Sequence, residues 1–289
     1  MDTSPNQRLQ TDRHLRCLPL SHMPLGESQN DMNTNLEQGE MSMNKQNTGN
    51  MELSESNRKT IYKIGGMAAL LTVVVAFGEM VITFLPGGNT PVETVFDWFT
   101  QLQGNWFMGL RNLGLLNIVM FTFGIPMYLA LFTAHRKGYK AFAALAMIFS
   151  FAGVAVFLAT NRAFSMLELS GQYAQATTEA QRSMFAAAGQ AMLSVGRSHS
   201  PGTFISFFLG ELAGVLMSVV MLQGKIFGKA TALIGIIGFT LLSIFEVCTS
   251  FIPVLKQVAL IFAMGGGLLN IIWLILLGRR LFQLVHTGE

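Results

Sequence analysis

Three glutamates stand inside long apolar stretches, where an ionisable side chain is uncommon: Glu79, Glu211 and Glu246. An acidic group at the centre of a membrane helix costs about 2.5–3.5 kcal/mol on insertion scales, so it needs a partner or a function. With a rise of about 1.5 Å per residue, we expect all three carboxyl groups to lie roughly 8–12 Å below the same membrane boundary. Carboxylates from three helices at one depth would form a site for a proton, a metal cation or an organic ammonium.

Three further polar residues belong to this candidate intramembrane site: Asn117, Asn270 and Arg111. The two asparagines lie somewhat deeper and would add neutral oxygen ligands. Arg111 favours a second interpretation, in which it pairs with one glutamate while the others stay protonated and hydrogen-bonded. The sequence leaves both interpretations open: one shared polar site, or separately satisfied structural groups.

Signals for enzyme chemistry are weak. The sequence has no His-Glu-x-x-His motif and no Walker-type or dinucleotide-binding glycine pattern. Ser198 and His199 place a hydroxyl beside an imidazole, but sequence neighbours rarely face each other, and we expect these residues to cap a loop. We therefore predict no catalytic residue, no cofactor and no metal ligand, with an enzyme that acts on lipid as a third alternative.

The apolar composition of the chain indicates that membrane-spanning helices carry these polar residues. Hydrophobic residues make up 51% of the chain and charged residues only 12%, whereas soluble domains carry about 25% charged residues. A helix needs about 20 apolar residues to cross a bilayer; six stretches qualify, and none alternates with the period of a strand. The fold class we predict is an all-α bundle of six transmembrane helices within residues 57–284, with spans at about 61–85, 107–133, 141–160, 203–223, 230–251 and 257–277.

Lysine and arginine gather at alternate ends of these spans. They precede the first span and follow the second, fourth and sixth, whereas the first loop, residues 86–106, has none and carries Glu93 and Asp97. Because positively charged loops stay in the cytoplasm, we predict a multi-pass protein of the plasma membrane with both termini cytoplasmic. Its partner is the lipid bilayer; nothing indicates nucleic acid, while a protein partner, a substrate and a homo-oligomer stay open.

Residues 161–202 form a long loop that we place outside the cell. Within this loop, Thr178–Val195 predicts one amphipathic helix that lies on the membrane interface or covers the end of the bundle. Its apolar face is made of Met184, Phe185, Ala188, Met192 and Val195. The run Ser165–Glu168 matches the capping box that begins many helices, so we expect a second helix start there.

Residues 1–56 are rich in Asn, Gln, Ser, Met and Glu and show no apolar periodicity. Such a segment buries too little apolar surface to offset its ordering entropy, and we predict a disordered cytoplasmic tail. Met51 opens a stretch that is typical of a natural start before a membrane helix. We therefore expect translation to begin near Met51, or residues 1–50 to be a dispensable extension.

Four stretches of the chain are similar to one known family: NRKTIYKIGG, FSMLELSGQYAQATTEAQRSMFAAAGQAML, KIFGKATALIGIIGF and LLGRRLFQL. They resemble domain-of-unknown-function family 4386, a group of bacterial and archaeal multi-pass membrane proteins, from about Asn57 to Leu284. The TTEAQR segment is the most distinctive part. The resemblance implies a six-helix fold and a start near Met51, and it brings no activity.

Two classes of function follow from these features. The first is a small transporter or permease-like protein that uses the acidic residues as a cation or proton site in the outer half of the membrane. The alternative is a non-catalytic structural or regulatory membrane protein, which would bind a partner or lipid through the long external loop.

Overall fold

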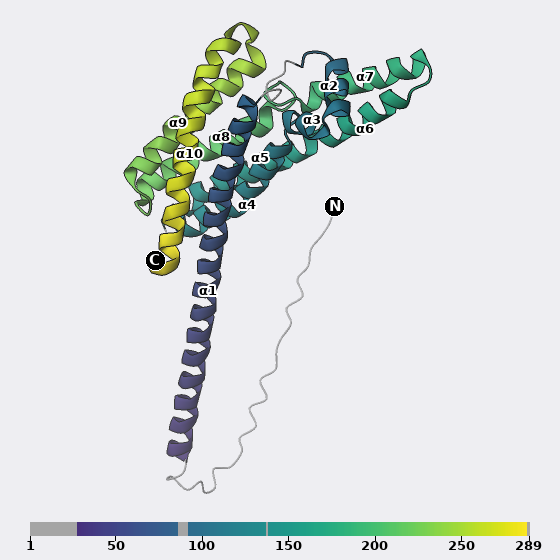
Figure 1. Cartoon of the computed structure of the whole chain (residues 1–289). Coiled ribbons are helices and arrows are strands. Elements are labelled where there is room, and N and C mark those ends of the chain that lie inside the picture. The colour runs from purple at the N-terminus through teal and green to yellow at the C-terminus, as the bar shows by residue number, and fades with distance from the viewer. Residues whose placement is uncertain (1–27, 86–91, 137, 288–289) are drawn as a thin grey trace, which may run out of the picture. The chain divides into compact units, whose positions relative to one another are not determined.

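The computed structural model describes residues 28–85, 92–136 and 138–287, with nearly all side chains from residue 55 onward. Contacts divide the chain into two units, residues 1–53 and 54–289, and both apolar clusters lie in the second unit. Over the described residues the chain is helical and has no strand (Figure 1). The elements in chain order are α1 (Ser28–Phe84), α2 (Val95–Gly104), α3 (Trp106–Asn112), α4 (Leu115–His135), α5 (Lys140–Thr160), α6 (Ala163–Gln175), α7 (Glu179–Gly196), α8 (Phe204–Gly224), α9 (Lys229–Phe251), the 3-10 turn η1 (Pro253–Leu255) and α10 (Lys256–Thr287).

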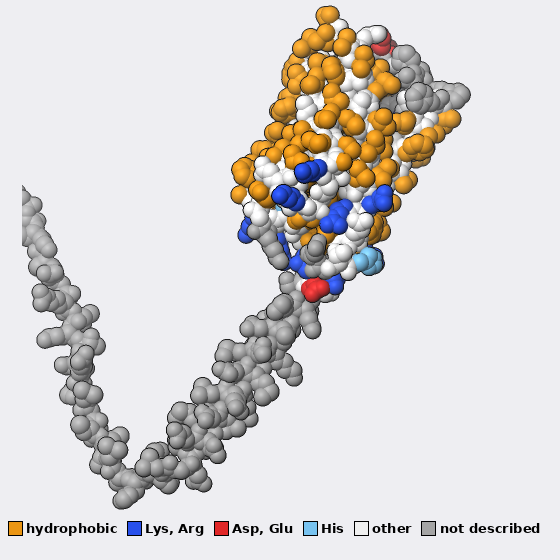
Figure 2. Space-filling view, turned by 90° about the vertical axis from the view of Figure 1, so that its left-hand side faces the viewer, with side chains coloured by type: hydrophobic (Ala, Val, Ile, Leu, Met, Phe, Trp, Pro, Cys, Tyr) orange, Lys and Arg blue, Asp and Glu red, His pale blue; other side chains and the backbone are white. Residues whose placement is uncertain are grey.

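Six of these helices are long and apolar enough to cross a membrane, which confirms the predicted all-α bundle. They are α1, α4, α5 with its continuation α6, α8, α9 and α10. Their outward faces carry large apolar side chains that no other helix covers, such as Val74, Ile148 and Met264 with exposed fractions of 66%, 57% and 70%. Figure 2 shows hydrophobic side chains over most of the visible surface of the bundle. A surface of this kind is stable in contact with lipid rather than water.

The spanning helices enclose one apolar core. α9 packs between α8 and α10, and α5 packs against α4 and α8. α1 joins the bundle through Gly65 and Gly66, whose missing side chains let it approach α4 and α10. The core is centred on fully buried side chains from all six spanning helices, among them Ala69, Leu131, Ala146, Met217, Ala232 and Trp273.

The second predicted span begins later than expected. A break at Leu113–Gly114 separates α3 from α4, because Gly114 has a left-handed backbone with a φ of 94°, which a residue with a Cβ rarely adopts. The Asn161 amide donates a hydrogen bond to the Leu113 carbonyl at 3.1 Å and so satisfies one of the groups that the break leaves without a helical partner.

The helices α2, α3, α6 and α7 form a second apolar cluster, which we call the cap (Figure 1). Its core consists of Val95, Trp98, Phe99, Leu102, Leu110, Leu113, Ala163, Met166 and Leu193. The chain enters α4 from the cap and enters the cap again from the last turn of α5. The cap therefore lies at the end of the bundle where α4 begins and α5 ends.

The expected amphipathic helix is present as α7. The Thr178 hydroxyl accepts a hydrogen bond from the Gln181 backbone and begins the helix with a capping box. The buried residues of α7 are Gly189, Leu193 and Gly196, whereas Met184 of the predicted apolar face is 58% exposed. Small residues face the cap here, because a Cβ on Gly189 would lie 2.7 Å from the Phe99 ring. Contact of the apolar face with the membrane interface stays a prediction.

The capping box predicted at Ser165–Glu168 is wrong. α6 already begins at Ala163, so Ser165 lies inside the helix, and the Asn161 side chain caps the Ala163 backbone at 3.0 Å. The first loop holds a real capping box, in which the Asp97 side chain accepts from the Thr94 backbone at 2.8 Å. Hydrogen bonds from the Thr94 backbone and hydroxyl hold the pKa of Asp97 below its usual value.

A disordered tail was predicted for residues 1–56, and the part of it that the structure describes is helical. Residues 28–56 are helical and continue into the first span as α1, while residues 1–27 lie outside the described residues. A helix that is already nucleated extends at little cost, and the Met, Leu, Glu, Gln and Lys residues of this segment have good helix propensity. A lack of apolar periodicity argues against burial, and it does not exclude a helix.

Basic residues gather at the end of the bundle opposite the cap, which we call the basic end. One pocket there is lined by the middle of α1 at Arg58 and Tyr62, the end of α4 with the turn after it, the turn after α8 and the last turns of α10. These are the segments in which the sequence concentrates lysine and arginine, and Figure 2 shows these side chains together below the hydrophobic surface. The alternation of charged loops thus corresponds to two chemically distinct ends of one bundle.

Candidate functional site

Glu211 and Glu246 lie close together between α8 and α9, near the end of the bundle that carries the cap. Both side chains are buried: Glu211 is 8% exposed and Glu246 is 0% exposed. The two carboxyl groups interact electrostatically, and the Ser243 hydroxyl lies within hydrogen-bond range of Glu211. One oxygen of Glu211, Oε2, is buried and has no hydrogen-bond partner among the described residues. Two of the predicted site residues therefore share one position in the membrane.

His199 connects this pair of carboxyl groups to the surface. Its Nδ1 lies 2.7 Å from Glu246 Oε2, and its side chain is 39% exposed whereas that of Glu246 is fully buried. The Ser250 hydroxyl donates to the other Glu246 oxygen at 3.3 Å. The imidazole thus reaches solvent or the lipid head groups on one side and a buried carboxyl group on the other.

The turn between α7 and α8 holds His199 in place. His199 has a left-handed φ of 54°, which is uncommon for a residue with a Cβ and points to a constrained position. The rings of Phe207 and Phe245 flank the imidazole at centroid distances of 4.5 and 4.9 Å. Gly202 allows the turn to close, because a Cβ there would lie 2.3 Å from the Ser194 carbonyl oxygen.

Glu79 belongs to a separate arrangement. The Arg111 guanidinium forms a salt bridge with its carboxylate at 2.8 Å and donates to its backbone carbonyl at 2.9 Å. The same guanidinium also donates to the hydroxyl of Thr83, one turn along α1, and to the Asn112 side chain. Arg111 is 6% exposed. This bonding ties α1 to α3 in the cap and leaves Glu79 neutralised by a local partner.

The two asparagines of the predicted site lie apart from these hydrogen bonds. Asn117 is half-buried in the first turn of α4. Asn270 lies on α10, where its Oδ1 is buried without a hydrogen-bond partner among the described residues. The structure thus divides the six predicted residues: Arg111 serves Glu79, Glu211 and Glu246 form a pair, and each asparagine has its own surroundings.

Sequence reasoning missed the contribution of His199. The neighbouring Ser198 suggested a nucleophile and its base, but the Ser198 hydroxyl is buried without a hydrogen-bond partner among the described residues, and the imidazole bonds to Glu246 instead. The available signal was topological: His199 and Glu246 flank the same end of the two adjacent helices α8 and α9. A buried acid near the end of one helix can reach a polar side chain in the turn that begins or ends a neighbouring helix.

The chemistry that this arrangement supports is proton transfer. Within the part of the chain that the structure describes, no group of three or more His, Cys, Asp or Glu residues is placed to hold a metal ion. Two carboxyl groups at close range in an apolar setting resist double ionisation, so they tend to hold one proton between them. An imidazole at hydrogen-bond distance is the side chain best suited to exchange that proton with water near neutral pH.

No protein-family model, curated protein or solved structure matches the chain. The function is therefore argued from the geometry of the described residues.

Proposed function

We propose that this chain is a small proton-translocating transport protein of the plasma membrane, with Glu211 and Glu246 as its protonation site and His199 as the group that exchanges protons with the outer side. The observation that carries the proposal is the continuous series from a half-exposed imidazole to a fully buried carboxyl group and then to a second buried carboxyl group. Ionisable residues within membrane helices are costly and are typical of proton relays.

Three features support a proton rather than a larger cation as the species that the pair binds. Each carboxyl group already has a hydroxyl neighbour: Ser250 donates to Glu246, and Ser243 lies beside Glu211. The Ser243 hydroxyl donates to the Phe239 carbonyl at 2.9 Å, so its oxygen can accept a hydrogen bond from the protonated form of Glu211. The rings of Phe207 and Phe245 fill the space around His199. Glu79, which would be the third acid of a cation site, is held by Arg111.

The orientation is part of the proposal. Positively charged ends stay in the cytoplasm, so the basic end would face the cytoplasm and the cap would face outward. Both ends of the six-helix region would then be cytoplasmic, and His199 would meet protons from the outer side. The resemblance to domain-of-unknown-function family 4386 remains a prediction beside this proposal.

Proton flux into liposomes tests the function. The protein is reconstituted into vesicles that enclose a pH-sensitive dye, and a potassium gradient with valinomycin makes the interior negative. We expect the interior to acidify faster than in protein-free vesicles, and Glu246→Gln to remove nearly all of this protein-dependent flux. Glu168→Gln is the matched control, because Glu168 is an exposed acid on α6. Equal rates for the wild type and protein-free vesicles would contradict the proposal.

The alternative function is a structural or regulatory role of the cap. Phe96, Trp106 and Phe164 on the cap helices are 51%, 59% and 59% exposed, and exposed aromatic side chains favour contact with a lipid interface or a partner protein. This alternative predicts that Phe164→Ser reduces binding of the cap to a partner protein and that Glu246→Gln leaves this binding unchanged.

A further inference from the structure

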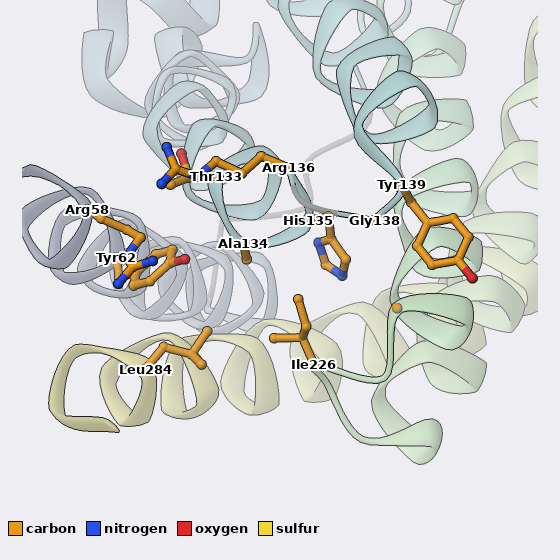
Figure 3. A pocket seen from close by; sticks show the side chains of 11 residues that line it. Arg58, Tyr62, Thr133, Ala134, His135, Arg136, Gly138, Tyr139, Ile226 and Leu284 are labelled. Carbon is orange, nitrogen blue, oxygen red and sulfur yellow. The ribbon is translucent and has the colours of Figure 1, made fainter. Parts of the chain in front are cut away.

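A pocket of about 490 Å³ opens at the basic end of the bundle, beside the end of α8 and the turn before α9, whereas Glu211 lies in the first half of α8 and Glu246 in the second half of α9. Its described lining contains no acidic residue, and its polar part consists of Arg58, Tyr62, Thr133, His135, Arg136 and Tyr139. Figure 3 shows these side chains, which come from α1, from the end of α4 and from the turn that follows it. Its volume lies within the range of about 300–1,000 Å³ that is typical of small-molecule sites.

Two guanidinium groups lie on the same side of this pocket. Arg58 and Arg136 both interact electrostatically with the Tyr62 hydroxyl, and Figure 3 shows the Arg136 side chain extending toward the other two residues. Two positively charged groups that act on the same hydroxyl make this side of the pocket electropositive, which favours an anionic ligand. Planar guanidinium groups fit the oxygens of carboxylate and phosphate groups in particular.

His135 adds a buried polar atom to the same pocket. Its side chain is 2% exposed, and its ring nitrogen Nδ1 lies 2.9 Å from the Leu131 carbonyl oxygen, to which it must donate. In the neutral ring, Nε2 is then an acceptor, and this atom is buried without a hydrogen-bond partner among the described residues. An unsatisfied buried polar group costs about 1–3 kcal/mol, so Nε2 points to a ligand that carries a hydroxyl group.

Gly224 keeps the space beside His135 open. A Cβ at position 224 would lie 2.8 Å from the imidazole carbon Cδ2 and 3.2 Å from Nε2, and Gly224 itself lines the pocket. The remaining lining is apolar and includes Ile226 and Leu284. A ligand that fits this pocket therefore has an anionic group and a hydroxyl group. Its remaining part is apolar, or lies next to apolar groups such as lipid chains.

We propose that this pocket binds the phosphate group of an anionic ligand. Arg58 and Arg136 contact the phosphate oxygens, the Tyr62 hydroxyl donates a further hydrogen bond, and His135 Nε2 accepts one from a ligand hydroxyl. Two sources share this chemistry: the head group of an anionic phospholipid in the adjoining leaflet, and a soluble phosphate ester. Basic pockets between membrane helices at the cytoplasmic side are suited to such head groups.

Binding of three probes to the full-length protein tests the proposal. The protein in a neutral detergent is mixed with phosphatidylglycerol, with phosphatidylcholine of the same acyl chains, or with glycerol 3-phosphate, and native mass spectrometry measures the bound fraction. We expect phosphatidylglycerol to bind more tightly than phosphatidylcholine. Arg136→Gln should weaken this binding about fivefold, the effect expected for loss of one basic side chain near an anionic head group.

Arg279→Gln is the matched control, because Arg279 is an exposed arginine near the end of α10 that does not line the pocket. It should keep wild-type affinity. Tyr62→Phe is a second variant that keeps the ring and removes the hydroxyl, and it should also weaken binding. Arg136 is exposed, so its replacement leaves the fold intact.

The probes separate the two sources of phosphate. Binding of phosphatidylglycerol alone assigns the ligand to the bilayer, and binding of glycerol 3-phosphate assigns it to the soluble phase; either result supports the site. Equal binding of the two lipids without binding of glycerol 3-phosphate would overturn the proposal. An Arg279→Gln effect as large as that of Arg136→Gln would also overturn it, because binding would then follow the general surface charge.

Discussion

Arg111 and Glu79 show how a buried charge is accommodated in this protein. Arg111 is almost fully buried, yet its guanidinium bonds to the carboxylate and the backbone carbonyl of Glu79. It also donates to the side chains of Thr83 and Asn112. An unpaired charge in such a place would be costly, whereas a paired and hydrogen-bonded one is tolerated. The pair thus joins α1 to the cap, and its role is structural.

Replacing Arg111 alone tests this role. Arg111→Met should lower the free energy of unfolding by about 3 kcal/mol, because it leaves the Glu79 carboxylate without its partner in a largely apolar site. The double variant Glu79→Leu with Arg111→Met should recover much of the loss. Unfolding in mixed detergent micelles, followed by helix content, measures both. Arg182→Met, on the exposed face of α7, should have little effect; a loss as large as that of Arg111→Met would contradict the role.

The sequence predicted part of this residue-level pattern. The cost of a carboxyl group in lipid singled out Glu211 and Glu246, and the structure places them together. The same argument grouped Glu79 with them, although Glu79 pairs with Arg111 on a helix of the cap. Depth along a span follows from the sequence, whereas the direction of a side chain around the bundle depends on which helices are neighbours. The sequence alone does not show which helices are neighbours, so the direction of each glutamate side chain could not be predicted.

Close contacts at glycines control how the helices approach each other. Gly214 on α8 faces Phe239 on α9, and a Cβ at position 214 would lie 2.4 Å from that ring. Gly235 on α9 likewise leaves room for Ser218 and Trp273 from its two neighbours. Small residues of this kind let membrane helices pack through direct van der Waals contact. The pair of buried carboxyl groups between α8 and α9 depends on this spacing.

Two glycines on one helix provide a matched comparison. Gly214→Ala should lower the free energy of unfolding by about 1–3 kcal/mol, because the new methyl group overlaps the Phe239 ring. Gly210→Ala, one turn earlier on α8, adds a methyl group with no atom within 4 Å and should leave stability unchanged or raise it by up to about 1 kcal/mol. Detergent unfolding of the two variants checks this order, and equal effects would contradict the packing.

The positions of the spanning helices were predicted better than the breaks and contacts of the other helices. Apolar length was enough to locate all six spans, because the bilayer sets a minimum length for each helix. The break at Gly114 was missed, since it interrupts an otherwise uniform apolar run, whereas the predicted end of the third span at residue 160 agrees with the end of α5. The residues of α7 that pack on the cap were not predicted, because small residues such as Gly189 carry no hydrophobic signal.

At the scale of the whole molecule, the two ends of the bundle have different chemistry. The cap end carries the buried carboxyl pair and His199, whereas the basic end carries the arginine-lined pocket. Between them, the outward faces of the six helices are apolar. The proposed proton site and the proposed anion site therefore lie at opposite ends of the bundle.

The central claim is that Glu211 and Glu246 hold one proton between them, and infrared spectroscopy of the protein in lipid bilayers tests it most directly. The account predicts a C=O stretching signal of a protonated carboxylic acid near neutral pH. Either Glu211→Gln or Glu246→Gln should shift or remove this signal, because each substitution takes away one of the two carboxyl groups that share the proton. Glu168→Gln should leave this signal unchanged. A wild-type spectrum without a protonated carboxylic acid, or one that neither substitution alters, would contradict the account.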